Sequence, residues 1–496
     1  MTRLFSRLGA FVVCAAALLG LVARASACPF CSAVSLTFAQ EIAQSQAAVI
    51  ARLVEPPPAA ALSPRAEGPL PKGKFQVVEV LKGSDLVADA GLLGADARPI
   101  ETIMLEEKPV GTLFLLMAVE PPDLVWSSPI RVSDRAVAYI KQLGTLPEKG
   151  PDRLAFFQQH LEDEDDALAR DAYDEFAVAP YADVRGLKDR MDAAKLLAWI
   201  ESPKVQANRR RLYATMLGVC GSPADAARIG AVLEGKTADG EPLPADKAEI
   251  RSGLDALIAC YVALRGPAAL DLVDRLFLER QGREVPFAET YAAVMALRFL
   301  GEESDLVPRD RVLRSLRILL DEPKLADLVI ADLARWQDWT VVDKLAAIFK
   351  DATSDNIFVR EPIVNYLRAC PLPEAAAAVK ELEKIDPEAC RRAATLAGLA
   401  AAISAAPADP QGDPGAGTPL AAPPPAAAGD AALATRIAPV IGDEEPMAEA
   451  GGAAKPAAVA PAGDRWKWLV WAAAVAVIAV VSRVMLRPGN AGRPVP

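Results

Sequence analysis

The stretch RRLYATMLGVCGSPADAARIGAVLEG, Arg210–Gly235, decides the fold of most of this 496-residue chain, because its plan recurs. It reads as one helix that ends in a Leu-x-x-Cys turn, a break led by proline, and a second helix rich in alanine. REPIVNYLRACPLPEAAAAVKELEKI, Arg360–Ile385, has the same plan, and Ile250–Glu279 and Thr290–Leu320 are looser copies. Such a helix pair cannot bury its apolar face alone, so a recurrence of about 35–45 residues predicts stacked pairs.

The helical pattern extends over 151–404, where apolar residues follow the period of a helix and prolines separate the helices. With its repeated stretches, this region resembles the HEAT-type helical repeat proteins of bacterial envelopes. The resemblance implies an α-solenoid with an extended concave face for binding. An irregular helical bundle is the alternative, and it would present no such face.

The preceding segment, 28–146, is rich in strands. Phe75–Leu81 alternates between two faces, as a half-buried strand does, and Pro121–Pro129 reads as a loop. Five short strands with one or two helices predict a small closed or half-closed barrel. The other predicted elements are strands at Ala47–Val54, Ile100–Leu105, Thr112–Val119 and Ile130–Ser133, and a helix at Asp134–Leu143.

The order of motifs in this segment is CPFC (Cys28–Cys31), a helix with a Phe, AAVIARLV, a strand ending in VEVLKG, and GTLFLL. That order is similar to the netrin-like modules, which include the tissue inhibitors of metalloproteinases. The resemblance implies an OB-type barrel, and it implies that Cys28 chelates a partner's catalytic zinc through its amine and carbonyl. Those inhibitors fasten their N-terminus to the barrel by disulfides, whereas no cysteine lies between Cys31 and Cys220 here.

The two ends of the chain read as targeting segments. Residues 1–27 have a positive start, an apolar run and an Ala-Ser-Ala site, which predict a signal peptide. Residues 405–464 are dominated by Ala, Pro and Gly, which predict a disordered linker.

Residues 466–486 form an apolar stretch of about 30 Å as a helix, which predicts one transmembrane segment. Tryptophans at one end and arginines at the other favour a cytoplasmic tail at 487–496. We therefore expect a single-pass membrane protein whose body is exported to the periplasm or cell surface. The predicted membrane-interface residues are Trp466, Trp468, Trp471, Arg483 and Arg487.

Charge and histidine content exclude several classes of function. The formal net charge of -11 argues against nucleic acid, which rewards clustered Lys and Arg. With a single histidine, His160, there is no His-His metal site and no HExxH protease motif. The sequence also has no glycine-rich phosphate loop, so it predicts no catalytic residue, no metal site and no cofactor.

The cysteines leave alternatives open. Cys28 and Cys31 form a C-x-x-C pair, which suits either a structural disulfide or thiol–disulfide exchange. Export implies an oxidising compartment, where the remaining cysteines could bridge as Cys220–Cys260 and Cys370–Cys390. Buried free thiols are the alternative for these four.

The predicted fold is thus multidomain, with a small OB-like β-barrel, an all-α HEAT-like solenoid, a disordered linker and one transmembrane helix. The expected function is a membrane-anchored, extracytoplasmic protein-interaction scaffold without catalytic activity, with a protein partner that the sequence does not name. The alternatives are an envelope thiol–disulfide redox protein that uses the CPFC motif and a metalloprotease inhibitor led by Cys28. The oligomeric state stays open.

Overall fold

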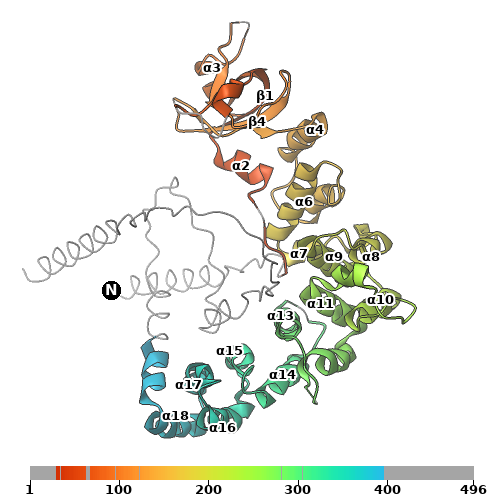
Figure 1. Cartoon of the computed structure of the whole chain (residues 1–496), viewed down its shortest axis with the longest axis vertical. Coiled ribbons are helices and arrows are strands. Elements are labelled where there is room, and N and C mark those ends of the chain that lie inside the picture. Colours follow the sequence, from red (N-terminus) through yellow and green to blue (C-terminus); the bar gives the residue numbers. More distant parts are fainter. Residues whose placement is uncertain are drawn as a thin grey trace, which may run out of the picture. The chain divides into compact units, whose positions relative to one another are not determined.

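The computed structural model describes residues 30–395, except positions 34, 63–67, 95, 122, 281 and 304, and these residues belong to one compact unit (Figure 1). None of the described helices is both long and apolar enough to span a bilayer. The predicted signal peptide, linker, transmembrane helix and tail lie outside the described residues, as do Cys28, Trp466, Trp468, Trp471, Arg483 and Arg487.

A six-stranded antiparallel sheet forms the first part of the structure, with the strand order β3-β2-β1-β4-β5 and with β6 also paired to β4. The hydroxyl of Thr102 in β3 lies 3.0 Å from the carbonyl of Trp126 and 2.9 Å from that of Ser127, and so links the two ends of the sheet. The sheet is therefore a nearly closed, barrel-like structure. Its strands are β1 (Ala47–Glu55), β2 (Lys72–Lys82), β3 (Ile100–Ile103), β4 (Leu113–Val119), β5 (Val125–Trp126) and β6 (Ile130–Arg131).

The central strand β1 is buried on both faces over its first five residues, because the sheet has a core on each side. Inside the barrel, Phe75 and Phe114 meet edge to face with ring centroids 5.3 Å apart. Outside it, Ile50 and Leu115 belong to an apolar cluster that continues into the helices. This double burial explains why AAVIARLV is a nearly continuous apolar run rather than a strict alternation.

Short helices accompany the sheet: α2 (Phe38–Gln44), α3 (Ser84–Asp89), α4 (Asp134–Leu143) and the 3-10 turn η1 (Ala59–Leu62). Thr37 caps α2 in a capping box with Gln40. Gly83 ends the VEVLKG motif with a φ of 72°, and a Cβ there would lie 2.5 Å from the carbonyl oxygen of Gln46. Only glycine fits this turn, because other residues would meet both the strained backbone and that clash.

The rest of the described chain is helical and packs in two layers. In one layer α9 packs on α11, α11 on α13, α13 on α15 and α15 on α17, while α8, α10, α14, α16 and α18 pack on these from the other layer. The helices are α5 (Pro151–Gln158), α6 (Asp166–Val178), α7 (Tyr181–Arg185), α8 (Ala193–Ile200), α9 (Ala207–Cys220), α10 (Pro223–Leu233), α11 (Leu254–Arg265), α12 (Leu270–Val273), α13 (Phe287–Glu302), α14 (Arg309–Ile318), α15 (Asp327–Arg335), α16 (Val342–Asp351), α17 (Arg360–Ala369) and α18 (Pro373–Ile385), with shorter turns at η2 (Lys188–Arg190), η3 (Ala245–Arg251), η4 (Pro267–Ala269), η5 (Asp274–Leu278), η6 (Leu319–Asp321), η7 (Trp339–Val341) and η8 (Ile357–Val359).

The two quoted stretches form the same unit. Arg210–Gly235 contains most of α9 and all of α10, and Arg360–Ile385 contains α17 and α18. The two arginines that open the stretches also have the same role. Arg210 donates from Nε to the carbonyl of Ile200 at 3.0 Å, at the end of α8, and Arg360 donates from Nε to the carbonyl of Phe349 at 3.3 Å, near the end of α16. In both copies an arginine of one helix thus donates to a carbonyl at the end of the preceding helix, where helical hydrogen bonding runs out.

Candidate functional site

The first residues that the structure describes, from Phe30 onward, pack against helices of the helical body. Phe30 is 9% exposed, and its ring meets that of Phe299 in α13 edge to face, with centroids 4.9 Å apart. Tyr181 of α7 contacts the same Phe299 ring at 5.2 Å. The aromatic residue of the CPFC motif therefore packs on Phe299 of α13, whose ring also contacts Tyr181 of α7.

Helix α6 binds this segment through three polar side chains. The Tyr173 hydroxyl donates to the carbonyl of Ser32 at 3.3 Å. Asp174 accepts from both the amide and the hydroxyl of Ser35, at 3.3 and 3.0 Å. Asp171 accepts from the amide of Phe38 at 2.6 Å, where α2 begins. The contacts fall at every third residue of the segment, and each one includes a main-chain group.

Asp171 is also the buried link between this segment and α4. Its other carboxylate oxygen accepts from the hydroxyl of Tyr139 at 2.6 Å. Burial raises the pKa of Asp171 to about 7, against the two hydrogen bonds, which lower it. One carboxyl thus fastens the start of α2 and the middle of α4 to α6.

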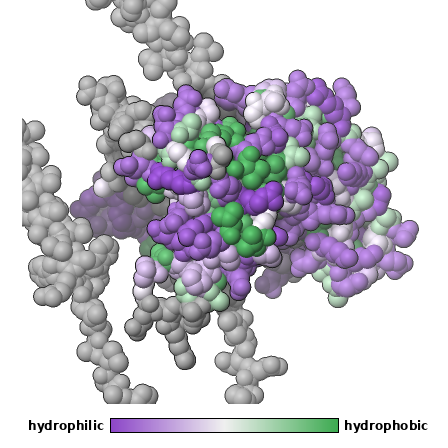
Figure 2. Space-filling model, turned by 90° about the horizontal axis from the view of Figure 1, so that it is seen from above, coloured by the Kyte–Doolittle hydropathy of each residue, from purple (hydrophilic) through white to green (hydrophobic). Residues whose placement is uncertain are grey.

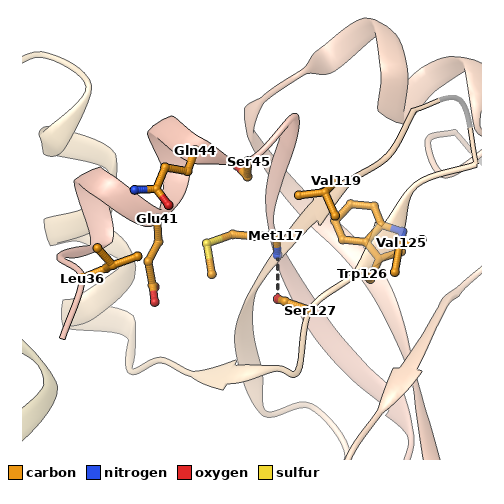
Figure 3. Close-up of a pocket in the computed structure, with 9 residues that line it drawn as sticks. All are labelled: Leu36, Glu41, Gln44, Ser45, Met117, Val119, Val125, Trp126 and Ser127. Atoms are coloured by element: carbon orange, nitrogen blue, oxygen red, sulfur yellow. Dashed lines mark hydrogen bonds between the residues drawn. The ribbon is translucent and has the colours of Figure 1, made fainter. Parts of the chain in front are cut away.

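A pocket of about 370 Å³ opens beside α2, where this helix faces β4 and β5 (Figure 3). The Met117 side chain points into it between the α2 wall and the strand wall (Figure 3). Three of its apolar residues, Leu36, Val119 and Val125, are 43%, 45% and 53% exposed. The lining residues are Leu36, Glu41, Gln44, Ser45, Met117, Val119, Val125, Trp126 and Ser127.

The pocket contains one carboxyl group, that of Glu41. Burial raises the pKa of Glu41, while the charge of Arg170 acts in the opposite direction. The other polar lining groups are neutral, and the Ser127 hydroxyl already accepts from the Met117 amide at 3.2 Å. The cavity therefore combines an apolar wall with one acidic group that a donor or a cation could satisfy.

Part of the strand wall comes from a segment that the sequence predicted as a loop. Within Pro121–Pro129, Val125 and Trp126 pair with Val119 and Ala118 as β5. The turn before β5 holds Glu120 and Leu124 at φ values of 59° and 35°, which is a strained region for side chains other than glycine. Strain of this kind persists where the surrounding structure enforces it, and it gathers near functional sites. The prediction of a loop was wrong because a two-residue strand has no period to recognise.

Figure 2 shows apolar residues gathered among polar ones on the surface seen from above. Exposed apolar side chains are frequent in and around the sheet. They are Leu36, Val54, Leu70, Val78, Leu93, Leu105, Val110, Val119 and Val125.

The structure places the cysteines as follows. Cys31 is disulfide-bonded, whereas Cys220, Cys260, Cys370 and Cys390 are free thiols. The predicted bridges Cys220–Cys260 and Cys370–Cys390 are therefore absent. Burial raises the pKa of Cys220 to about 11 and that of Cys260 further, so the thiolate that begins disulfide exchange is disfavoured. Cys260, Cys370 and Cys390 are buried in the core, and Cys220 packs against it partly exposed.

His160 and the acidic run after it have structural partners. Its Nδ1 lies 3.0 Å from a carboxylate oxygen of Asp163, and its ring contacts Tyr139. Asp165 caps α6 by accepting from the amide of Ala167. Among the described residues, no group of three or more His, Cys, Asp and Glu side chains could hold a metal ion.

Sequence reasoning missed the pocket and the α6 contacts, since their residues come from segments far apart in the chain. No protein-family profile matches the chain, and neither curated proteins nor solved structures give a match.

Proposed function

We propose that this chain is a membrane-anchored, extracytoplasmic protein-interaction scaffold, and that the pocket beside α2 binds an apolar side chain of a partner protein. The observation that carries the proposal is the pocket itself, in which exposed apolar residues of β4, β5 and the segment before α2 converge around one carboxyl group of α2. Concave apolar sites with a few polar groups are the usual place where a protein binds another molecule.

The wider architecture in this proposal is an OB-type barrel, like that of netrin-like modules, followed by HEAT-like helical repeats. The two-layer packing of α8–α18 and the matching roles of Arg210 and Arg360 support a repeat array rather than an irregular bundle. The anchoring rests on the sequence of residues 1–27 and 466–486.

The pocket favours a partner with an apolar side chain beside a basic or amide group. Contact with the partner would bury the apolar surfaces of Leu36, Val119 and Val125. This burial stabilises the complex by roughly 25 cal/mol for each Å² of apolar surface removed from water. Glu41 would accept a hydrogen bond from the partner and regain part of the solvation that burial removes. An acidic partner would meet the same carboxyl and be rejected.

Photo-crosslinking in the cells that make the protein tests this function. p-Benzoylphenylalanine is placed at Val125 in the pocket or at Val78 on β2, which is similarly exposed at 50% and does not line the pocket. We expect irradiation to give one discrete protein adduct from position 125 and none from position 78. Equal adducts from both positions, or none from either, would contradict the proposal.

A second measurement separates this function from the alternatives that use Cys28 and Cys31. With the crosslinked partner in hand, Val125→Asp is expected to weaken binding at least tenfold, and Val78→Asp is expected to leave it unchanged. Replacing Cys28 and Cys31 with Ser should preserve the partner of a scaffold. Loss of a disulfide-exchange or protease-inhibition activity in that double variant would favour the redox or the inhibitor proposal instead.

A further inference from the structure

The segment 30–38 is bound as a peptide ligand would be. Its described residues before α2 form neither helix nor strand, so neighbouring strands do not satisfy their main-chain groups. Instead, side chains of α6 bind the carbonyl of Ser32 and the amides of Ser35 and Phe38, while Phe30 packs on Phe299, whose ring also contacts Tyr181. Main-chain contacts at a regular interval with one aromatic anchor make a surface for an extended chain.

We propose that α6, α7 and α13 form a binding surface for an extended peptide of a partner protein that has an aromatic residue and no acidic residue, and that segment 30–38 occupies this surface in cis. The surface is distinct from the pocket beside α2, and the inference does not depend on it.

The chemistry of the surface sets this preference. Asp171 and Asp174 accept hydrogen bonds from the segment, so they match amide and hydroxyl groups and repel carboxylates. The segment FCSAVSLTF fits, since it contains no charged residue. Glu175, the next residue of α6, is satisfied by a two-point contact from Arg153, with Nε and Nη2 donating at 3.0 and 2.8 Å. Glu175 therefore needs no hydrogen-bond donor from a ligand.

The last contact of the segment with α6 belongs to the start of α2, whereas the earlier contacts belong to residues outside any helix or strand. The hydrogen bonds of α6 to Ser32 and Ser35 are 3.0–3.3 Å long, whereas the bond from the Phe38 amide to Asp171 is 2.6 Å and lies at the start of α2. A competing peptide can therefore displace residues 30–35 while α2 keeps its contact with Asp171. The observed affinity for such a peptide is the intrinsic affinity multiplied by the fraction of molecules in which the chain's own segment is not bound.

Binding of a synthetic peptide to the full chain tests this inference. The probe is fluorescein-labelled FSSAVSLTF, which reproduces residues 30–38 with Ser in place of Cys31, and its binding is followed by fluorescence anisotropy. We expect the Phe30→Ala protein to bind the probe at least tenfold more tightly than the wild-type protein, because the internal competitor has lost its anchor. A probe with Asp at the two positions that correspond to Ser32 and Ser35 should bind at least tenfold more weakly.

Two further substitutions in the Phe30→Ala protein locate the site. Phe299→Ala should reduce probe binding at least tenfold, and Asp174→Ala, which leaves the aromatic site intact, should also weaken it. Phe287→Ala is the matched control, since it lies on the same helix, about 18 Å away along the axis, and stacks on Tyr291. It should leave binding unchanged.

Three outcomes would overturn the inference. The first is that the Phe30→Ala protein binds the probe no more tightly than wild type. The second is that binding survives Asp174→Ala in a variant whose circular dichroism melt matches its parent. The third is a wild-type dimer in sedimentation that Phe30→Ala dissociates, which would assign the bound segment to a second copy of the chain.

Discussion

At the scale of single residues, Arg210 shows how a buried charge is retained in an apolar body. Its side chain is fully buried, and it donates at 3.0 Å to the carbonyl of Ile200 and at 2.8 Å to those of Ser202 and Val205, as well as to the hydroxyl of Ser252. The guanidinium therefore closes the end of α8 and the turn after it.

We expect Arg210→Met to destabilise the protein by about 3–5 kcal/mol, because the carbonyls of Ile200 and Val205 would be left without the donor that satisfies them, and Ser202 would lose one of two. Urea unfolding measures this loss. Arg209→Met is the control, since Arg209 makes only a longer contact of 3.4 Å to Glu162, and its loss should cost less than about 1 kcal/mol. Equal losses of unfolding free energy in the two variants would show that Arg210 stabilises this turn no more than Arg209 does.

Asp171 predicts a dependence of stability on pH. Its pKa is raised from 3.8 to about 7 in the folded protein, so between these values the folded state keeps a proton that the unfolded state has lost. Stability from this group is therefore fully present below about pH 4, falls as pH rises to 7, and is level above it. Asp171→Asn keeps an acceptor for the Phe38 amide and removes the titration.

We expect the free energy of unfolding of Asp171→Asn to vary less than that of wild type between pH 4 and 7, by about 2–4 kcal/mol over the interval. Urea unfolding at several pH values in this range gives both profiles. Parallel profiles would mean that Asp171 ionises normally in the folded protein.

At the scale of elements, the contact between the end of α13 and Trp336 depends on the absence of a side chain. A Cβ on Gly301 would lie 2.5 Å from the Trp336 ring, whose faces also carry the guanidinium groups of Arg309 and Arg335 at 5.0 and 5.5 Å. The added methyl group would therefore force the indole to shift away from its contacts with the two guanidinium groups.

We therefore expect Gly301→Ala to lower stability by about 1–3 kcal/mol, although alanine is the better helix former. Thermal unfolding followed by circular dichroism measures the change. Gly144→Ala is the control, because a Cβ at Gly144 meets no atom within 4 Å. If Gly301→Ala is neutral or stabilising, the packing of α13 on Trp336 is looser than described.

The sequence predicted elements well where a period extends over several residues. The predicted helix at Asp134–Leu143 is α4, with the same bounds, and the strand predicted at Ala47–Val54 is β1 within one residue. Prediction failed where pairing across the fold decides the structure. Trp126 becomes part of a strand only through β4, and Asp171 and Asp174 look like ordinary helix residues although their partners lie 133 and 139 residues away.

The prediction of two disulfides in the helical body failed for a related reason. The aligned Leu-x-x-Cys turns place Cys220 and Cys370 at equivalent positions in two repeats, which suggested bridges to the next helices. In the structure, Cys260 instead lies against Gly218, whose Cβ, if present, would be 3.3 Å from the Cys260 Cα. The sequence shows that a cysteine is on a helix, but it does not show the direction in which its Sγ points once two helices pack this closely.

At the scale of the whole molecule, the sheet and the helical body share one apolar core, which predicts how they unfold. Leu115 and Leu116 are neighbours in β4, and both are fully buried, but Leu115 belongs to the cluster that continues into the helices and Leu116 to the barrel interior. Substitutions of these two leucines therefore probe different apolar clusters, while burial and position in the chain are nearly the same.

We expect Leu115→Ala and Leu116→Ala each to cost about 2–5 kcal/mol, as large cavities do. Hydrogen exchange read by mass spectrometry should distinguish them. Leu115→Ala should reduce protection in β4 and also in α4 and α6, because its cavity opens the core that these helices share with the sheet. Leu116→Ala should reduce protection in β1, β2 and β4 and leave α6 near its wild-type rate. If the two variants give the same pattern, the cores are coupled through the sheet, and the barrel and the helical body open as a single cooperative unit.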